Sequence, residues 1–337
     1  MNQETSADIN SLNSFPGYTD WKKSKFCCFD SIYIPSIQKH FFGHWEISCG
    51  FPISVYTIII TSYLFGMIFV IPSFHYQTLV FNLMIIFSVL FFLFAYSYFR
   101  ILHDGPGYFP FYWPDSGPAE PGEPLDTDDP SHSSSLLHSL DDIPEGIIST
   151  PDQLKWCKQY HLDRPNRCVL SRSARRIVIR PDHFCDWAAC WIGKRNHKFF
   201  ILFNLWGAIY IFFFFICSLV GVVLELRSPN PSFIFIFYFI YIFLAVFFLF
   251  FTGFFASDSI SLACKNRTNW EDWSNVDPHR FDTGSPCDNI QDICGQNKAL
   301  WLLPISPFSS LSNWDLIKDY EKSYRDIPLT QKETFSD

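Results

Sequence analysis

Four long apolar segments constrain the fold of this chain more than any other feature of its sequence. They cover roughly residues 50–74, 77–98, 199–224 and 232–256. Each is long enough to cross a bilayer, since about 20 apolar residues span about 30 Å of hydrocarbon. None contains Asp, Glu, Lys or Arg, whereas ion and proton pathways usually need such groups, so the pattern argues against a channel or transporter. We expect an α-helical polytopic membrane protein with four transmembrane helices.

The distribution of basic residues predicts which side each loop faces. The first 49 residues contain four lysines and the loop from Lys155 to Lys198 contains an arginine run, whereas the connection near His75 has neither Lys nor Arg. Because cytosolic loops carry an excess of Lys and Arg, we expect both termini and the central loop to face the cytosol. Residues 1–49 show no apolar core of the signal-peptide type, so we expect the first span to be its own anchor.

Composition argues against an ordinary soluble enzyme, because 48% of the 337 residues are hydrophobic and 39 are Phe. The 11 Cys are scattered along the chain, and on this topology most lie in a reducing compartment, so we interpret them as thiols. Much of the formal charge of −8 comes from one segment, 114–152, which has no Lys or Arg and many Asp, Glu, Ser and Pro residues. We expect it to be a disordered acidic insert without a catalytic role.

The loop between the second and third apolar segments contains an acid, an imidazole and a thiol within four residues. These are Asp182, His183 and Cys185. A thiol is a useful nucleophile only as a thiolate, and an imidazole held in one tautomer by a carboxylate is a compact base for removing its proton. Taken alone, a Cys two residues after a His is more often an inert buried thiol. Both interpretations stay open on these three residues.

These three residues belong to a larger pattern that extends over more than forty positions. Its members are Cys157, Arg164, Pro165, Arg167, Asp182, His183, Cys185, Trp187, Gly193, Asn196, Phe199 and Phe200. The pattern resembles, without gaps, the cysteine-rich domain of the Asp-His-His-Cys (DHHC-type) protein S-acyltransferases, also called palmitoyltransferases. Residues 104–107 look like that family's Asp-Pro-Gly motif with one inserted Gly, and 268–271 look like its Thr-Thr-x-Glu motif with Asn269 for the second Thr. Residues 281–295 loosely match its carboxy-terminal motif.

The resemblance implies an enzyme, a protein-cysteine S-palmitoyltransferase. His183, oriented by Asp182, takes the proton of Cys185, and the thiolate attacks a long-chain acyl-CoA such as palmitoyl-CoA. The acyl group then passes from a Cys185 thioester to a cysteine of a client protein. The alternative is a catalytically silent membrane scaffold that binds acyl-CoA or client proteins, and the departures Asp186 and Ala189 favour it. Cys190 stands where the family has Asn, and we expect it to be structural or incidental.

The resemblance also suggests contacts with acyl-CoA. The residues are Trp187, Lys194, Arg195, Lys198, Tyr210, Thr268 and Asn269. The three basic residues either hold the CoA phosphates or only anchor the span at the headgroups. Tyr210 either closes the end of an acyl-chain cavity or is an ordinary packing residue. Asn269 can donate a hydrogen bond to Asp182, as the family's Thr does.

Of the positions that match the family's two structural zinc sites, only Cys157 keeps a residue that could bind metal. For the first site they are Cys157, Tyr160, Leu170 and Ile177, and for the second Ser171, Ala174, Phe184 and Trp191. Structural zinc takes about four Cys, His or carboxylate ligands, so we expect no structural zinc and name no metal-binding residue. Five of the replacements are large and apolar, and burying each contributes roughly 1.5 to 3 kcal/mol. We expect a hydrophobic core in place of two metal centres.

The expected segments follow from these patterns. They are a cytosolic amino-terminal segment (1–49), transmembrane helices 1 and 2 (50–101), a cytosolic turn with the acidic disordered insert (102–154), a DHHC-type catalytic domain (155–198), transmembrane helices 3 and 4 (199–256) and a cytosolic carboxy-terminal segment (257–337). The expected partners are membrane lipid and client proteins with membrane-proximal cysteines, and no nucleic acid. The family implies an endomembrane location in the Golgi, endoplasmic reticulum or plasma membrane. The sequence does not indicate an oligomeric state.

Overall fold

The computed structural model describes residues 22–26, 29–34, 39–42, 45–46, 50–108, 167–171, 176–228, 233–311 and 316. The acidic insert expected within 102–154 lies outside this part from residue 109 onward. Cys157, Tyr160 and Ala174 also lie outside it.

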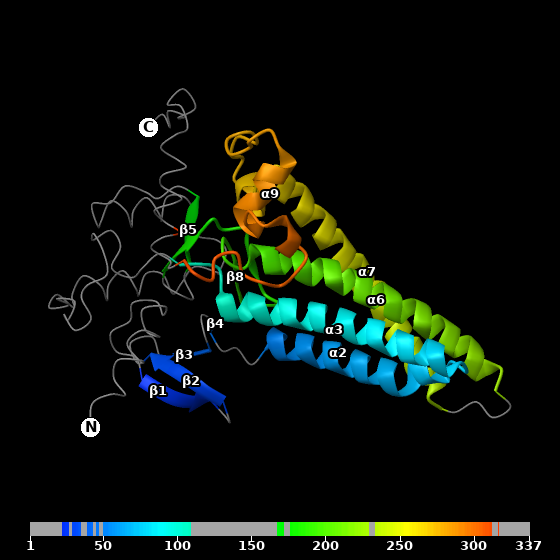
Figure 1. Cartoon of the computed structure of the whole chain (residues 1–337). Coiled ribbons are helices and arrows are strands. Elements are labelled where there is room, and N and C mark those ends of the chain that lie inside the picture. Colours follow the sequence, from blue (N-terminus) through cyan, green and yellow to red (C-terminus); the bar gives the residue numbers. More distant parts are fainter. Residues whose placement is uncertain are drawn as a thin grey trace, which may run out of the picture.

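Four membrane-spanning helical segments form a bundle, which confirms the expected fold class (Figure 1). They are Phe51–Ser73, composed of α2 (Phe51–Phe65), η2 (Gly66–Val70) and η3 (Ile71–Ser73); α3 (Gln77–Asp104); α6 (His197–Leu226); and α7 (Phe235–Cys264). Helix α3 ends where Gly105 adopts φ 64° and Pro106 follows, because proline cannot continue a helix and glycine tolerates positive φ. α6 packs along both α3 and α7, so it lies at the centre of the bundle.

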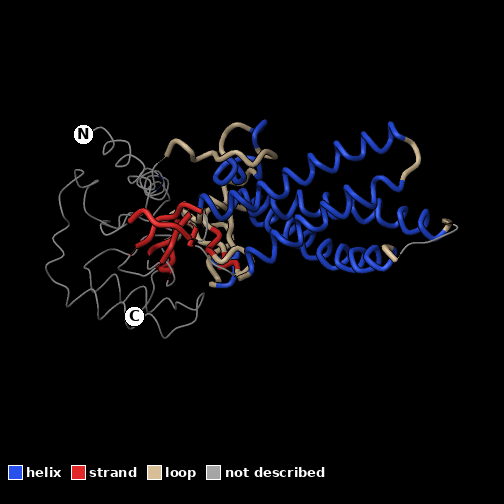
Figure 2. Tube along the Cα trace, turned by 90° about the horizontal axis from the view of Figure 1, so that it is seen from below, coloured by secondary structure: helices blue, strands red, loops and turns tan. Residues whose placement is uncertain are grey.

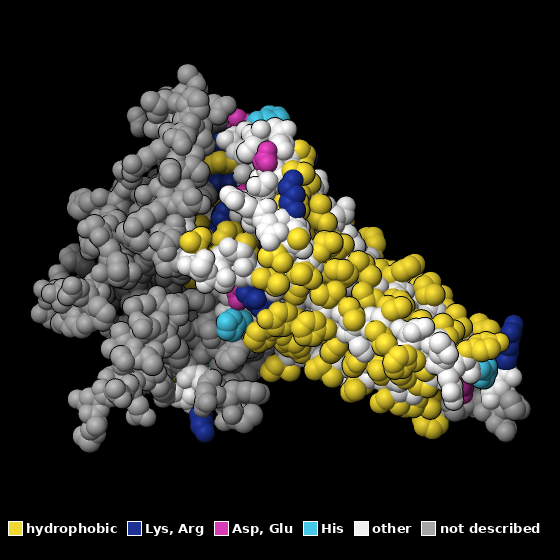
Figure 3. All heavy atoms as spheres, in the orientation of Figure 1, with side chains coloured by type: hydrophobic (Ala, Val, Ile, Leu, Met, Phe, Trp, Pro, Cys, Tyr) yellow, Lys and Arg dark blue, Asp and Glu magenta, His cyan; other side chains and the backbone are white. Residues whose placement is uncertain are grey.

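Apolar side chains cover the face of the bundle seen in Figure 3, and charged side chains gather near its two ends. Large side chains such as Phe92, Phe243 and Phe250 expose 60%, 72% and 71% of their surface. Soluble monomers rarely expose apolar patches of this extent. The surface is that of an integral membrane protein, whose outward-facing phenylalanines contact lipid.

A small domain of two hairpins lies at one end of the bundle, between α3 and α6 in the chain (Figure 2). Its antiparallel pairs are β5 (Cys168–Ser171) with β6 (Arg176–Ile179), and β7 (His183–Cys185) with β8 (Cys190–Ile192). Gly193 lies where this domain meets the turn after α3. A Cβ at this position would approach the carbonyl oxygens of Pro106 and Ile179 to 2.7 and 2.9 Å. Only glycine fits so close to two backbone oxygens without displacement.

Aromatic residues occupy the place that matches the second zinc site of the family. Phe184 and Trp191 are register partners across β7 and β8, and their ring centroids are 6.0 Å apart. Trp191 is buried and also packs edge-on against Trp270, at 5.9 Å. Within the described ranges, no group of three or more His, Cys, Asp or Glu side chains is arranged to hold a metal ion. An apolar cluster therefore joins the hairpin to the segment that follows α7.

The segment after α7 folds back over the hairpin domain. Its elements are α8 (Asn269–Trp273), α9 (Pro286–Cys294) and η4 (Lys298–Leu300). A separate antiparallel sheet near the amino terminus has the order β1-β2-β3-β4, with β1 (Lys22–Phe26), β2 (Phe29–Ile34), β3 (Lys39–Phe42) and β4 (Trp45–Glu46). Helix α9 packs against both α6 and α7, so the carboxy-terminal segment is fixed to the same end of the bundle as the hairpins.

Candidate active site

The β7–β8 hairpin presents the acid, the imidazole and the thiol together. Residues 186–189 form its turn, in which Ala188 N donates to Cys185 O at 3.1 Å and Ala189 adopts φ 49°. Cys185 is the last residue of β7 and is 8% exposed, while His183 packs edge-on against Phe200 of α6 at 4.8 Å. The hairpin thus holds the thiol and the imidazole on one short strand against the bundle.

Asp182 is fully buried and its carboxylate is saturated with donors. His183 Nδ1 donates to Asp182 Oδ2 at 2.7 Å, which leaves Nε2 as the ring nitrogen free to accept a proton. Asn269 donates twice, from its backbone N to Oδ1 at 2.9 Å and from Nδ2 to Oδ2 at 3.0 Å. The hydrogen bond expected from Asn269 to Asp182 is present, so the amide replaces the hydroxyl of a Thr.

The surroundings lower the pKa of Asp182 and raise the pKa of His183. Burial alone raises the pKa of Asp182, but His197, His183 and Asn269 outweigh it and hold that pKa well below its ordinary value. Burial lowers the pKa of His183, but hydrogen bonds to Asp182 and to Cys185 outweigh it and raise the pKa to about 10. Asp182 is therefore ionised at neutral pH, and His183 is a strong base that keeps a proton once it has accepted one.

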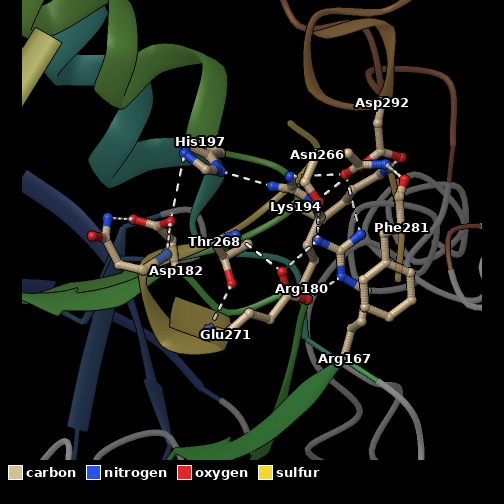
Figure 4. A network of polar contacts seen from close by, with 11 residues as sticks. Arg167, Arg180, Asp182, Lys194, His197, Asn266, Thr268, Glu271, Phe281 and Asp292 are labelled. Carbon is tan, nitrogen blue, oxygen red and sulfur yellow. Dashed lines mark hydrogen bonds and ion pairs between the residues drawn. The ribbon is translucent and has the colours of Figure 1, made fainter. Parts of the chain in front are cut away.

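A second histidine, His197, lies between Asp182 and Arg180 (Figure 4). Arg180 Nη1 donates to His197 Nδ1 at 2.8 Å, which places the ring proton on Nε2, and Nε2 faces Asp182 Oδ1 at 3.8 Å. Arg180 Nε also pairs with Asp292 of α9 at 2.9 Å. Arg180, Asp182 and His197 are all 0% exposed. Charged side chains so deeply buried are rarely found unpaired. This row of pairs connects the carboxy-terminal segment to the buried carboxylate of Asp182.

A parallel contact holds α8 in place. Arg167 donates from Nη2 to Glu271 Oε2 at 2.9 Å, also binds the other carboxylate oxygen, and lies over the ring of Phe281 at 4.0 Å. Glu271 in turn accepts from the backbone N of Thr268, while the Thr268 hydroxyl accepts from Glu271 N, which is a capping box at the start of α8. The cap fixes the direction in which Asn269 points toward Asp182.

The sequence alone did not assign these supporting roles. No sequence pattern identifies Arg180, His197 or Asp292 as partners of the acid. The available signals were the position of His197 beside Asn196 at the start of a span, and an acidic residue within the loosely matched segment 281–295. Neither signal identifies a partner, because Asp292 lies 112 positions from Arg180 and a lone His at the start of a span does not show what it contacts.

An apolar cavity of about 210 Å³ lies between the four spans. Its lining includes Val55, Phe94, Tyr210, Phe214 and Phe255 from the helices, together with Trp187 from the β7–β8 turn. The Tyr98 hydroxyl donates to the carbonyl oxygen of Trp187 at 2.6 Å, and the Trp187 ring lies 5.3 Å from that of Phe51. Trp187 is two residues after Cys185, which belongs to the same buried apolar cluster as Tyr210 and Phe214 of the lining.

Tyr210 and Ser62 meet across the bundle within the lining of this cavity. Their hydroxyl oxygens are 2.9 Å apart, and the Tyr210 ring stacks on Phe87 at 4.8 Å. Tyr210 is thirteen residues beyond the start of α6 at His197, which is about 20 Å along a helix. The pair joins α2 to α6 well inside the bundle.

The basic residues expected at the CoA phosphates have partners within the chain. Lys194 pairs with Asp292, and Lys198 donates to the carbonyl oxygens of Leu300 and Ile305 at 2.7 and 2.8 Å. Both lysines are buried, and Arg195 binds the carbonyl oxygen of Leu311. These contacts fasten the carboxy-terminal segment and give no support to a role in phosphate binding.

Thr268 and Asn269, also expected to contact acyl-CoA, have structural partners as well. Thr268 is 0% exposed and caps α8, whereas Asn269 binds Asp182. The described geometry therefore gives both residues a supporting role behind the acid. Of the expected ligand contacts, Trp187 and Tyr210 are the two that line the cavity.

Comparison with known proteins places the site in a family. Residues 150–276 match the family model described as DHHC palmitoyltransferase. The chain is 28% identical over 246 residues to palmitoyltransferase PFA3 of Saccharomyces cerevisiae, covering 63% of this chain and 67% of that protein. It is 26% identical over 194 residues to palmitoyltransferase ZDHHC2 of Rattus norvegicus, which covers 53% of this chain and 50% of that relative. It is also 26% identical over 238 residues to probable protein S-acyltransferase 14 of Arabidopsis thaliana, which covers 66% of this chain and 71% of that relative. The chain thus spans half to about two thirds of these relatives' lengths.

The raised pKa of His183 predicts how Cys185 reactivity depends on pH. In the wild type the imidazolium is lost only as the pH rises toward about 10. Asp182→Asn removes the charge that raises this pKa, so His183 becomes neutral at a lower pH and no longer stabilises a thiolate by charge. We expect iodoacetamide to alkylate Cys185 about tenfold more slowly at pH 7 in the variant, a difference that shrinks near pH 9, where unperturbed thiols ionise on their own (pKa about 8.5).

The control for this experiment is Asp186→Asn, a carboxylate-to-amide change at an exposed position in the same turn. It removes a negative charge beside the thiol, so alkylation at pH 7 should not slow. Identical pH profiles for wild type and Asp182→Asn would contradict the assigned role of the acid.

Proposed function

The chain is a member of the DHHC palmitoyltransferase family, and from this premise we propose that it is a protein S-acyltransferase that uses Cys185 as its nucleophile. The observation that carries the proposal is the hydrogen bond from His183 to Asp182, with Cys185 two residues further along the same strand and Trp187 of the adjoining turn lining an apolar cavity. The cavity suits a long acyl chain, and the thiol suits transfer of a thioester-linked acyl group. A silent scaffold is less well supported, because scaffolding does not require the acid, base and thiol to be aligned.

The proposed reaction has two balanced steps. His183 holds, as imidazolium, the proton that Cys185 has given up. The thiolate attacks the carbonyl carbon of acyl-CoA, and the CoA sulfur leaves with the proton from His183, which is then neutral for the second step. The acyl group is then a thioester on Cys185. A client cysteine, deprotonated by His183, attacks this thioester, and Cys185 leaves as the thiolate. Asp182 stays ionised throughout and holds the imidazole in position.

The acyl chain is proposed to lie in the cavity between the spans, with Trp187 near the thiol and Tyr210 deeper in the bundle. Three basic side chains reach the CoA phosphates by exchanging their present partners within the chain. They are Lys194, Arg195 and Lys198. By the distribution of basic residues, the hairpin domain faces the cytosol. Clients are proteins with membrane-proximal cysteines, in the Golgi, endoplasmic reticulum or plasma membrane.

We also propose that the hairpin domain folds without structural zinc. The support is the ring contact between Phe184 and Trp191, with Trp270 beside them, at the place of the second site. Leu170 and Ile177, which match two ligands of the first site, are register partners across β5 and β6. In this proposal, apolar packing stabilises the hairpin domain in place of zinc. The ion pairs of Arg167 and Arg180 with the carboxy-terminal segment stabilise it further.

Fatty-acid labelling tests the proposed activity. Membranes that contain the protein are incubated with a clickable palmitate analogue, and hydroxylamine-sensitive label on the protein is measured. We expect Cys185→Ser to remove this label, and His183→Ala to reduce its rate about 100-fold or more, the usual contribution of general acid–base catalysis. Cys168→Ala, which removes another buried thiol of the same domain, should keep the label. Thioester label that persists in Cys185→Ser would favour the scaffold.

The position of Tyr210 in the cavity lining predicts a preference for acyl-chain length. Tyr210→Ala removes the ring and its contact with Ser62 and so extends the cavity. We expect the ratio of stearoyl-CoA to palmitoyl-CoA use to rise several-fold. Tyr210→Phe loses the hydroxyl but keeps the ring, and should stay close to the wild-type ratio. An unchanged ratio in Tyr210→Ala would show that Tyr210 is only a packing residue.

Metal analysis tests the proposed zinc-free domain. Purified protein should contain well under one zinc per chain, and a strong chelator should not lower its melting temperature, because structural zinc normally couples directly to folding. A content near two zinc per chain would overturn this part of the proposal.

A further inference from the structure

A second thiol lies directly opposite the proposed nucleophile. Cys185 and Cys190 are register partners in the β7–β8 pair, at the two ends of the turn 186–189. Each is 8% exposed, and both belong to the same buried cluster. The acyl-transfer mechanism makes no use of Cys190.

The hairpin holds the two cysteines at a separation that suits a disulfide. Residues directly opposite each other in an antiparallel pair have Cα atoms about 4.5 to 5.5 Å apart and side chains on the same face. Disulfides form across Cα separations of about 4.4 to 6.8 Å. The hydrogen bonds Ala188 N to Cys185 O and Ala189 N to Asp186 O, both 3.1 Å, keep the turn short.

The surroundings give the two sulfurs different reactivity. Burial raises the pKa of Cys190 well above its ordinary value, and the negative charge of Cys185 raises it further. Asn196 Nδ2 also contacts Cys190 Sγ at 3.9 Å. Cys190 is therefore held as a protonated thiol, while Cys185 lies two residues after His183 on the same strand, with that imidazole as its base in the proposed mechanism.

We propose that Cys185 and Cys190 form a reversible disulfide when a peroxide oxidises the site. The Cys185 thiolate attacks hydrogen peroxide, which gives a sulfenic acid on Cys185 and a hydroxide that takes a proton to become water. The Cys190 sulfur then attacks the sulfenic sulfur, the S–S bond forms, and the hydroxyl leaves as a second water with the Cys190 proton. A dithiol reductant restores both thiols.

The disulfide has two consequences for the site. It removes the nucleophile, so acyl transfer stops while the bond persists. It also consumes the sulfenic acid before further oxidation to sulfinic acid, which ordinary thiols do not reverse. The inference rests on the reactivity of Cys185 and not on acyl transfer itself, so it can be tested without a client or acyl-CoA.

Mass spectrometry of one peptide measures the disulfide directly. Trypsin cleaves after Arg176 and Lys194, and cleavage before Pro181 is blocked, so residues 177–194 form one peptide that contains Cys185 and Cys190. The full-length protein is treated with hydrogen peroxide, quenched, unfolded and alkylated with N-ethylmaleimide. We expect the peptide to carry no maleimide and to be lighter by two hydrogens. Peptide 168–172, with the buried thiol Cys168, should still be alkylated.

Recovery of Cys185 gives the second readout. After peroxide and then dithiothreitol, the wild type should regain most of its alkylatable Cys185. Cys190→Ala, with each protein compared with its own untreated sample, should regain several-fold less and accumulate sulfinic acid. Cys190→Ser serves if the alanine variant does not fold. An oxidised peptide without the internal link, or equal recovery in both proteins, would overturn the proposal; acyl transfer that continues at the untreated rate while the link is intact would instead count against the proposed function.

Discussion

The buried carboxylate of Asp182 is the interaction on which the rest of the site depends. An isolated ionised carboxylate is costly to bury, and it persists in a protein only when charges and donors surround it. Here His183, His197 and Asn269 do so, and each comes from a different element: strand β7, the start of α6 and the start of α8. The ionised acid in turn holds the proton of His183, so the packing of three elements determines the base strength available to Cys185.

The carboxy-terminal segment belongs to the catalytic architecture for the same reason. Asp292 on α9 pairs with Arg180 and Lys194, and Arg180 orients His197 behind the acid. Breaking one partner of a buried pair costs about 3 to 5 kcal/mol, because the other charge is left uncompensated. These pairs, with the Trp191 cluster, stabilise a small hairpin domain that has too few residues to build a sizeable core of its own. The bundle then supplies the apolar cavity beside the thiol.

Local patterns in the sequence predicted the four spans, because hydrophobicity is a contiguous feature, and they pointed to the Asp182–Cys185 run as the candidate site for the same reason. Partners distant in sequence could not be predicted in this way. Lys194 and Lys198 looked like free charges at a membrane edge, since a sequence shows charge but not burial. Thr268 looked like a ligand contact, whereas it caps α8. Cys190 looked incidental until the register placed it opposite Cys185.

The pre-steady-state burst of CoA release tests the central claim most directly. Purified protein is mixed with excess palmitoyl-CoA in the absence of a client, and free CoA is followed with time. If the Cys185 sulfur takes the acyl group itself, a burst of about one CoA per active chain should precede slow hydrolysis. This burst should vanish in Cys185→Ser. A burst of the same size in Cys185→Ser, or no burst in the wild type, would contradict the account.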